Sequence, residues 1–244
     1  MKVKIINPNT CLEMTRSIEE IARGCARPDT EMVVVSPKRG PISVEDFYDE
    51  ALATVGVIEE VKTGIKEKFD GFIIACFGDP GLYASRELTE SPVIGVAEAS
   101  FYMACMLGYK FSILSVLDRF NAFREELLRK YGLESRCASI RCTNVPVLDF
   151  ERDREKARDA LLKAGKQAVE EDRAEVLCLG CAGMVGLDRE LERELGVPVI
   201  DPVVAAVKMI EGIIECGKKT SKIMTFRPPE TKEIKGFPKT LDLK

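Results

Sequence analysis

The sequence predicts an α/β protein with two pseudo-symmetric lobes, each a mostly parallel four-stranded sheet flanked by helices. Two observations support this prediction. Short apolar runs rich in Val and Ile alternate with longer amphipathic segments, which is typical of a parallel sheet covered by helices. The order and spacing of these runs then repeat in the second half of the chain, which indicates a duplicated unit.

Eight apolar runs form two corresponding series of predicted strands. The first series covers residues 2–7, 31–35, 71–75 and 93–96, and the second covers residues 110–116, 136–142, 175–180 and 199–201. Each series has four members in the same order. The second half of the chain is therefore predicted to copy the fold of the first.

Helices are predicted between the strands from capping residues and apolar periodicity. The predicted starts are Thr10 with Glu13, Ser43 with Asp46, and Asp201 with Pro202, and the predicted stops are Gly24 and Gly132. Two more spans, residues 119–130 and 154–171, have the periodicity of a helix with one polar face.

The two series divide the chain into a first lobe of residues 1–97 and a second lobe of residues 98–204. The last predicted helix is not followed by another strand, so we expect residues 205–225 to pack back on the first lobe. Residues 226–244 are rich in proline and lysine, and we expect a polar C-terminal tail outside the core.

The composition narrows the possible partners and location. Hydrophobic residues make up 45% of the chain and charged residues 31%, as in ordinary soluble globular proteins. The net charge of −4 gives no electrostatic reason to expect nucleic acid or an anionic membrane as a partner. No apolar run approaches the roughly 20 residues that span a bilayer, and the N-terminus leads directly into a strand. We therefore expect a cytoplasmic protein that binds a small molecule.

The chain contains nine cysteines and no histidine. The absence of histidine removes the usual general base near neutral pH and the commonest zinc ligand. Acid–base chemistry then falls to thiols, carboxylates, lysines or tyrosines. The glycine-rich phosphate-binding motifs of nucleotide sites are also absent from the sequence, so no cofactor and no metal is predicted.

Cys76 and Cys181 occupy matching positions in two passages that are copies of each other. In both, a Gly-Leu pair begins five residues after the cysteine, and a Pro-Val-Ile run begins 16 residues after the first cysteine and 17 after the second. This repeat suggests two thiols that face each other across a pseudo-twofold axis. Such a pair is suited to handling a proton on both faces of one carbon atom.

Each of these cysteines directly follows an apolar strand and precedes a loop that contains glycine. Ligands of open parallel sheets bind beyond the carboxyl ends of the strands, and glycines such as Gly78 and Gly183 free backbone N–H groups to point at a ligand. We expect the helix N-terminus after each loop to favour the thiolate and lower the cysteine pKa. The alternative for any single cysteine is a packing role in the core.

Cys178 and Cys181 form a C-x-x-C motif, which is also found in redox pairs and half zinc sites. Here Cys178 lies within a predicted strand, and strand alternation sends it to the face opposite Cys181. No second C-x-x-C and no histidine completes a zinc set in the sequence. The redox interpretation is kept as an alternative.

Further candidates lie at the ends of the first strand of each series. Asn9 offers its amide or nearby N–H groups to a carbonyl or carboxylate of a ligand. Ser115, with Val116 beside it, holds the matching position in the second copy. Asp79 lies in a Gly-Asp-Pro-Gly stretch, which is also strong turn chemistry.

Three segments of the chain carry a recognisable pattern: Ile-Asn-Pro-Asn-Thr at residues 6–10, Ala-Cys-Phe-Gly-Asp-Pro-Gly-Leu at 75–82, and Leu-Gly-Cys-Ala-Gly-Met at 179–184. They resemble the hydantoin and allantoin racemases of the aspartate/glutamate/hydantoin racemase superfamily. The resemblance covers residues 1–216. It implies a cofactor-independent mechanism with Cys76 and Cys181 as the two bases, a site between the lobes, and a homo-oligomer.

Departures from the amino-acid racemases indicate a different substrate. Those enzymes usually have Asn and Thr after the first cysteine and Thr-His after the second, whereas this chain has Phe77-Gly78 and Ala182-Gly183. Fewer donors remain for a free ammonium and carboxylate, so a compact uncharged ring fits better. The related arylmalonate decarboxylases retain one of the two cysteines, and the presence of both argues against decarboxylation.

The resulting hypothesis is racemisation at C5 of a five-membered cyclic ureide, with a hydantoin, allantoin or another acidic-carbon compound as substrate. One thiolate removes the C5 proton and the other thiol protonates the opposite face, while Phe77 packs on the ring. Backbone N–H groups are expected to bind the enolate oxygen. The residues that would supply them are Gly78, Asp79, Gly183 and Met184. The alternative of another class is a non-catalytic small-molecule binding protein.

Overall fold

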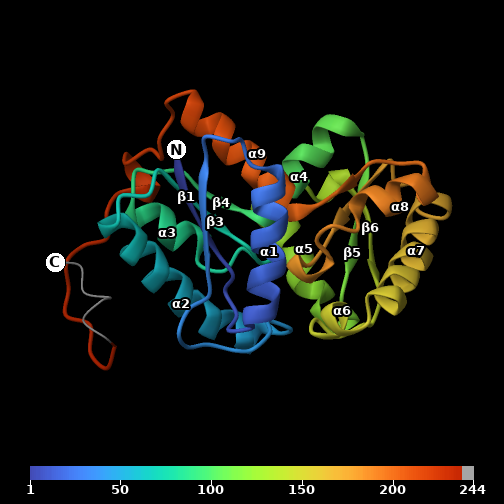
Figure 1. Ribbon diagram of the computed structural model, residues 1–244, viewed down its shortest axis with the longest axis horizontal. Coiled ribbons are helices and arrows are strands. Elements are labelled where there is room, and N and C mark those ends of the chain that lie inside the picture. Colours follow the sequence, from blue (N-terminus) through green and yellow to red (C-terminus); the bar gives the residue numbers. More distant parts are fainter. Residues whose placement is uncertain (238–244) are drawn as a thin grey trace.

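Two four-stranded parallel sheets lie side by side, one from each half of the chain, in the computed structural model (Figure 1). The structure describes residues 1–237. The strand orders are β2-β1-β3-β4 and β6-β5-β7-β8, so corresponding strands hold corresponding places. The first sheet contains β1 (Lys2–Ile6), β2 (Glu31–Val35), β3 (Gly71–Ile74) and β4 (Val93–Gly95), and the second contains β5 (Phe111–Ser115), β6 (Cys137–Cys142), β7 (Val176–Leu179) and β8 (Val199–Ile200). The predicted α/β fold is confirmed.

The central strands of both sheets are buried along their length. Strands β3, β5 and β7 are buried at every residue, as expected for a parallel sheet covered on both faces. Ile6 pairs with Ile74 in the first sheet, and Leu114 pairs with Leu179 in the second. Within each sheet, the two central strands therefore end at about the same level. The loops after β3 and β7 begin at this edge.

Helices follow the strands in the predicted order. They are α1 (Leu12–Cys25), α2 (Phe47–Lys66), α3 (Leu82–Leu88), α4 (Val96–Leu107), α5 (Asn121–Tyr131), α6 (Asp149–Arg152), α7 (Arg154–Glu170), α8 (Asp188–Leu195) and α9 (Pro202–Glu215). Two of the predicted end signals are confirmed. Gly132 ends α5 with a φ of 69°, and the Asp201 carboxylate accepts hydrogen bonds from the first N–H groups of α9.

Two of the predicted helix starts are wrong. The N-cap of α1 is Cys11, whose N–H donates to Asn9 Oδ1, and the Thr10 hydroxyl instead donates to the carbonyl of Pro41. Helix α2 begins after Asp46, which caps the N–H of Asp49, so Ser43 lies outside the helix. Helix α1 also continues one residue past Gly24. The capping residue at each start is set by the hydrogen bonds that neighbouring loop residues make. A capping motif in the sequence does not contain this information.

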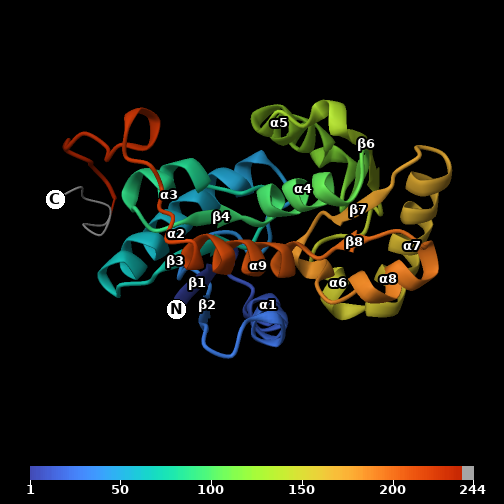
Figure 2. The ribbon, with the colours of Figure 1, turned by 90° about the horizontal axis from the view of Figure 1, so that it is seen from above.

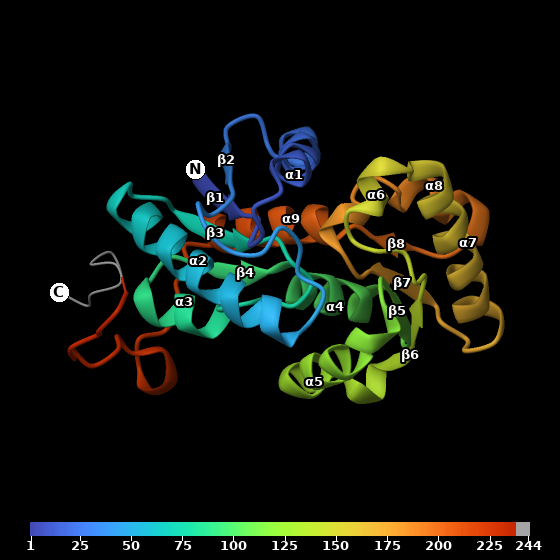
Figure 3. The same cartoon turned by 90° about the horizontal axis from the view of Figure 1, so that it is seen from below.

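Helices α4 and α9 lie between the two sheets, as the views from above and below both show (Figures 2 and 3). Helix α4 contacts α9 and β7, and α9 contacts α1, β3 and β4 of the first sheet. The fit is close at Gly71, where an added Cβ would lie 2.7 Å from Ile210 Cδ1 of α9. The last helix therefore returns to the first sheet after the chain has completed the second.

The segment after α9 runs along the outer side of α3, away from the second sheet (Figure 1). Thr220 N–H donates to the Glu90 carbonyl, and the Phe226 ring packs on Tyr83 with centroids 5.6 Å apart. The predicted tail of residues 226–244 is mostly exposed as far as residue 237, and its remainder lies outside the described residues. Among the described helices, none has both the length and the apolar character needed to cross a membrane.

Candidate active site

The loops after β3 and β7 bring Cys76 and Cys181 to one small cavity between the sheets. We call residues 76–81 the first cysteine loop and residues 181–186 the second cysteine loop. The cavity has a volume of about 20 Å³. Its lining comes from both halves of the chain: Asn9, Met14, Val44, Ala75, Cys76, Phe77, Val116, Arg124, Val147, Gly180, Cys181 and Ala182. Two predicted bases from equivalent strands thus line the same cavity.

The two cysteine loops share one hydrogen-bond pattern. The N–H two residues after each cysteine donates to its sulfur: Gly78 to Cys76, and Gly183 to Cys181 Sγ at 3.3 Å. The next N–H donates to the cysteine carbonyl, from Asp79 at 2.9 Å and from Met184 at 3.1 Å. The four N–H groups expected to bind an enolate oxygen therefore all donate to the cysteines in this structure.

Burial has a larger effect on the pKa of Cys76 than any helix terminus. Burial raises the pKa of the Cys76 thiol to about 12, against the opposing effects of the Arg124 guanidinium and the Gly78 N–H. The expected lowering of this pKa by a following helix is wrong, because burial has the larger effect. Helix α3 begins only at Leu82, six residues after Cys76.

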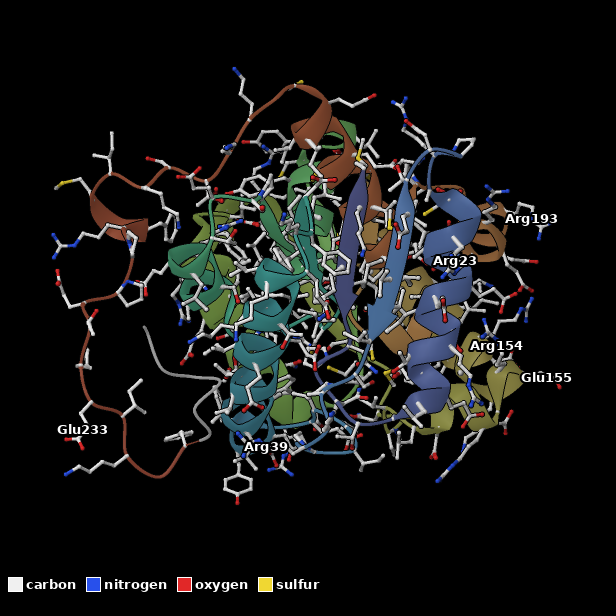
Figure 4. The ribbon with its side chains drawn as sticks, turned by 60° about the vertical axis from the view of Figure 1, so that its left-hand side comes forward. Arg23, Arg39, Arg154, Glu155, Arg193 and Glu233 are labelled. Carbon is white, nitrogen blue, oxygen red and sulfur yellow. The ribbon has the colours of Figure 1, made fainter. Side chains whose placement is uncertain are left out.

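Arg124 is the charged cavity-lining side chain that sequence reasoning missed. Arginines such as Arg23, Arg154 and Arg193 lie at the surface (Figure 4), whereas Arg124 is only 3% exposed. Its Nη1 donates to the Phe77 carbonyl and its Nη2 to the Gly180 carbonyl at 3.1 Å. The guanidinium thus joins the residue after one cysteine to the residue before the other.

A signal for Arg124 was present in the sequence. Helix α5 buries Phe120 from the preceding turn, Phe123, Leu127 and Tyr131, which recur at helical spacing. Arg124 lies within that apolar stripe, four residues after Phe120, and its guanidinium stacks 4.8 Å from the Phe120 ring centroid. A charged residue at a core position of an amphipathic helix is uncommon and indicates a specific role.

The structure places the other predicted ligand-binding residues in different surroundings. Asn9 lines the cavity, with Oδ1 accepting from Asn7 Nδ2 at 2.9 Å and Nδ2 directed to Met14 Sδ at 3.2 Å. Val116 lines the cavity, whereas the neighbouring Ser115 is fully buried outside its lining. Phe77 also lines the cavity, with its ring at right angles to that of Phe101.

Asp79 lies behind the cavity and holds the first cysteine loop in place. Its carboxylate accepts hydrogen bonds from Ala97 N–H at 3.0 Å, Glu98 N–H at 2.9 Å and the Tyr131 hydroxyl at 2.6 Å. Burial raises the pKa of Asp79 to about 6. Its φ of 50° is in the left-handed region, so the Gly-Asp-Pro-Gly turn is confirmed as a structural element. Gly78, Gly183 and Met184 likewise lie outside the lining.

One loop from each half of the chain borders the cavity. We call these two loops, residues 36–46 and residues 143–148, the roof. Val44 comes from the segment before α2, and Val147 comes from the segment after β6. The Val147 N–H donates to Glu45 Oε1 at 2.8 Å, and Arg119 pairs with Asp46 at 3.4 Å. A cavity of about 20 Å³ holds no more than a water molecule or so. A ring-sized ligand is larger than this space, so we expect the roof to move when such a ligand binds.

The C-x-x-C cysteines lie on opposite faces, as strand alternation predicts. Cys178 is fully buried in β7, and its Sγ is directed to the Ser100 carbonyl at 3.8 Å, toward α4. Cys181 faces the cavity instead. In the part of the chain that the structure describes, none of the nine cysteines forms a disulfide, and no group of three or more potential ligand residues is arranged to hold a metal ion.

The duplicated α/β fold is one that racemases have, and comparison with known proteins shows the family. Residues 3–210 match the model of the Asp/Glu/Hydantoin racemase family. A hydantoin racemase of Pseudomonas sp. (strain NS671) is 55% identical over 97% of this chain and 95% of its own. The allantoin racemases of Klebsiella pneumoniae and Pseudomonas fluorescens superpose with TM-scores of 0.94.

The first of these structures is 44% identical and covers 97% of this chain and 96% of its own. The second is 38% identical and covers 97% of this chain and 100% of its own. The chain belongs to the Asp/Glu/Hydantoin racemase family.

Proposed function

We propose that the chain racemises a hydantoin-type cyclic ureide at C5, with Cys76 and Cys181 as the two bases and without a cofactor. One observation carries the proposal: two thiols from equivalent loops of a duplicated fold line the same cavity from the two halves of the chain. A racemase needs a proton acceptor on one face of the carbon and a proton donor on the other.

The proton transfers balance without a redox step or co-reactant. The thiolate of one cysteine takes the C5 proton and becomes a thiol, and the electron pair of the C–H bond passes to the enolate of the C4 carbonyl. The thiol of the other cysteine then donates its proton to the opposite face of C5 and becomes a thiolate. The opposite enantiomer reacts with these roles exchanged.

The enolate oxygen needs hydrogen-bond donors other than those predicted from sequence. Phe77 and Ala182 immediately follow the two cysteines and line the cavity. Their backbone N–H groups have no hydrogen-bond partner within residues 1–237. One such donor contributes about 3 kcal/mol to stabilising an oxyanion in enzymes that use them.

The lining favours a neutral ring with an apolar substituent. None of the described residues that line the cavity is an acid, so a free ammonium group would find no counter-charge there. Three valines and Met14 make up much of the wall. This composition supports a 5-alkyl hydantoin over allantoin, whose polar ureido substituent would leave hydrogen-bonding groups facing apolar side chains.

The test uses each pure enantiomer of a 5-alkyl hydantoin, and of allantoin, in deuterated water. We expect Cys76→Ser and Cys181→Ser each to lose about 10³-fold or more of the racemisation rate. Each variant should still exchange the C5 proton of one enantiomer, and the two variants should differ in which one. Undiminished racemisation by either variant would overturn the two-thiol mechanism. Binding of a hydantoin by the wild type without deuterium incorporation would identify a non-catalytic binding protein.

A further inference from the structure

The Arg124 guanidinium lies at the junction of the two cysteine loops. It donates to the Phe77 carbonyl on one side and to the Gly180 carbonyl on the other, and it lines the same cavity as both cysteines. Phe77 follows Cys76 directly, and Gly180 directly precedes Cys181. The guanidinium thus contacts a sequence neighbour of each of the two cysteines.

This buried charge lacks a carboxylate partner. Within residues 1–237 no Asp or Glu forms an ion pair with Arg124, and its Nε is buried without a hydrogen-bond partner. The nearest acid of the loops, Asp79, directs its carboxylate to Ala97 N–H, Glu98 N–H and the Tyr131 hydroxyl. An uncompensated buried charge is strongly destabilising, so a counter-charge is expected close by.

We infer that this counter-charge is one thiolate shared by Cys76 and Cys181. Arg124 then keeps one cysteine of the pair as a thiolate while the other is a thiol. The inference rests on the proposed function, because a two-base racemase must start each turnover with one thiolate and one thiol. The negative charge moves from one sulfur to the other in every turnover. A guanidinium bound to the residue after Cys76 and to the residue before Cys181 stabilises this charge on either sulfur.

Four groups from three other parts of the fold act electrostatically on Arg124. Cys76 and Asp79 come from the first cysteine loop, Cys181 from the second, and Cys142 from the end of β6. On Cys76, Arg124 and Asp79 have opposite effects: the guanidinium lowers the pKa of the thiol and the carboxylate raises it. Substitutions of these two residues therefore shift the thiolate population in opposite directions.

The test is the ultraviolet absorbance of the thiolate, measured in the full chain without substrate. The absorbance of the Cys76→Ser/Cys181→Ser double variant is subtracted from that of the wild type, which removes the other seven thiols. Burial of Cys76 opposes a thiolate there, so the test asks whether the guanidinium outweighs burial for the pair of cysteines. We expect one thiolate equivalent near neutral pH. Arg124→Gln should lose it and regain it only at a pH higher by about one unit or more. Arg124→Lys should retain most of it.

Two further variants separate the electrostatic role from a structural one. Asp79→Asn should move the thiolate titration to lower pH, the direction opposite to Arg124→Gln. Arg129→Gln, which removes an exposed charge from the same helix, should leave the titration unchanged. The low-pH limb of kcat/KM should follow the absorbance in every variant.

A wild type without difference absorbance at neutral pH would overturn the inference, and so would an Arg124→Gln titration identical to that of the wild type. The wild-type measurement decides even if Arg124→Gln does not fold. The absorbance requires no turnover. A thiolate that is present in a protein without racemase activity would therefore refute the proposed function while leaving the Arg124 inference intact.

Discussion

The two cysteine loops have the same backbone hydrogen bonds around the sulfur but different surroundings. Each sulfur accepts the N–H two residues on, and each cysteine carbonyl accepts the N–H three residues on. Three positions after the cysteine, the first loop has Asp79, bound to α4 and α5, and the second has Met184, which is fully buried. The duplication has preserved the atoms that would handle the proton, while the packing that supports them has diverged.

The glycine two positions after each cysteine provides the largest expected contrast. An added Cβ at Gly78 would lie 3.0 Å from Phe123 Cε1, whose ring stacks on Phe120 and so has little room to move. At Gly183 the nearest atoms would be 3.6 Å away, in ordinary contact. We expect Gly78→Ala to cost about 1–3 kcal/mol of stability and about 100-fold in activity, because the loop that carries Cys76 must shift.

Gly183→Ala is the matched control and should cost less than about 1 kcal/mol and a few-fold in activity. Urea unfolding and racemisation rates measure both effects. Equal losses at the two glycines would show that the loops are constrained alike, contrary to this comparison.

Asp79 makes the contribution of the first cysteine loop to the free energy of unfolding depend on pH. Met184, at the matching position of the second loop, cannot titrate. Burial raises the pKa of Asp79 to about 6 from an ordinary value of 3.8. Between these values the folded protein retains the proton and the unfolded chain releases it. The free energy of unfolding therefore falls as the pH rises through this window, by roughly 3 kcal/mol at most.

Asp79→Asn should remove this loss. Relative to wild type, its free energy of unfolding should rise by about 2–3 kcal/mol between about pH 4 and about pH 7. Urea titrations at a series of pH values measure the difference, from which the contributions of other carboxyl groups cancel. A difference that does not vary with pH would mean that Asp79 titrates normally.

The contrast between the loops also explains which parts of the molecule could be predicted from sequence. All eight strands lie within one or two residues of their predicted bounds, since alternating apolar and amphipathic segments determine them locally. The positions of Cys76 and Cys181 follow from those strands. The predicted ligand donors do not line the cavity, because the N–H groups of a tight loop bind the nearest acceptor, here the cysteine itself.

Arg124 and the roof could not be located in this way. Helix α5 was predicted, but the contact of Arg124 with the Gly180 carbonyl depends on how two separate segments of the chain come together. The same holds for Val44 and Val147, which come from loops without regular periodicity. Only the apolar stripe around Arg124 carried a local signal.

The roof takes one loop from each half of the chain, and the Glu45–Val147 hydrogen bond tests whether it limits ligand exchange. Removing this bond with Glu45→Ala should favour the open form both with and without ligand. We therefore expect binding and release to become about fivefold faster with little change in Kd, from a contribution of about 1 kcal/mol.

A 5,5-disubstituted hydantoin is a suitable probe because it has no C5 proton to exchange, and NMR line shapes give its exchange rates. Glu125→Ala, which removes an exposed carboxylate from α5, is the control. Unchanged rates in Glu45→Ala would show that the roof opens elsewhere.

The smallest expected effect concerns Cys178, which has no thiol counterpart in the first half of the chain. Three residues before Cys76 the chain has Ile73, a fully buried core residue, whereas three residues before Cys181 it has Cys178, equally buried. An apolar side chain at the matching position indicates that packing alone is required there. Cys178→Ser should keep kcat/KM within about twofold and cost about 1–2 kcal/mol of stability, because a buried hydroxyl replaces the thiol.

Progress curves for both enantiomers and urea unfolding measure these quantities, with Cys181→Ser as the inactive reference. The serine hydroxyl still has the Ser100 carbonyl as an acceptor, which keeps the cost in stability small. A loss of activity comparable to that of Cys181→Ser would mean that Cys178 and Cys181 act together as a thiol pair. The functional partner of Cys181 would then lie in its own strand rather than in the other half of the chain.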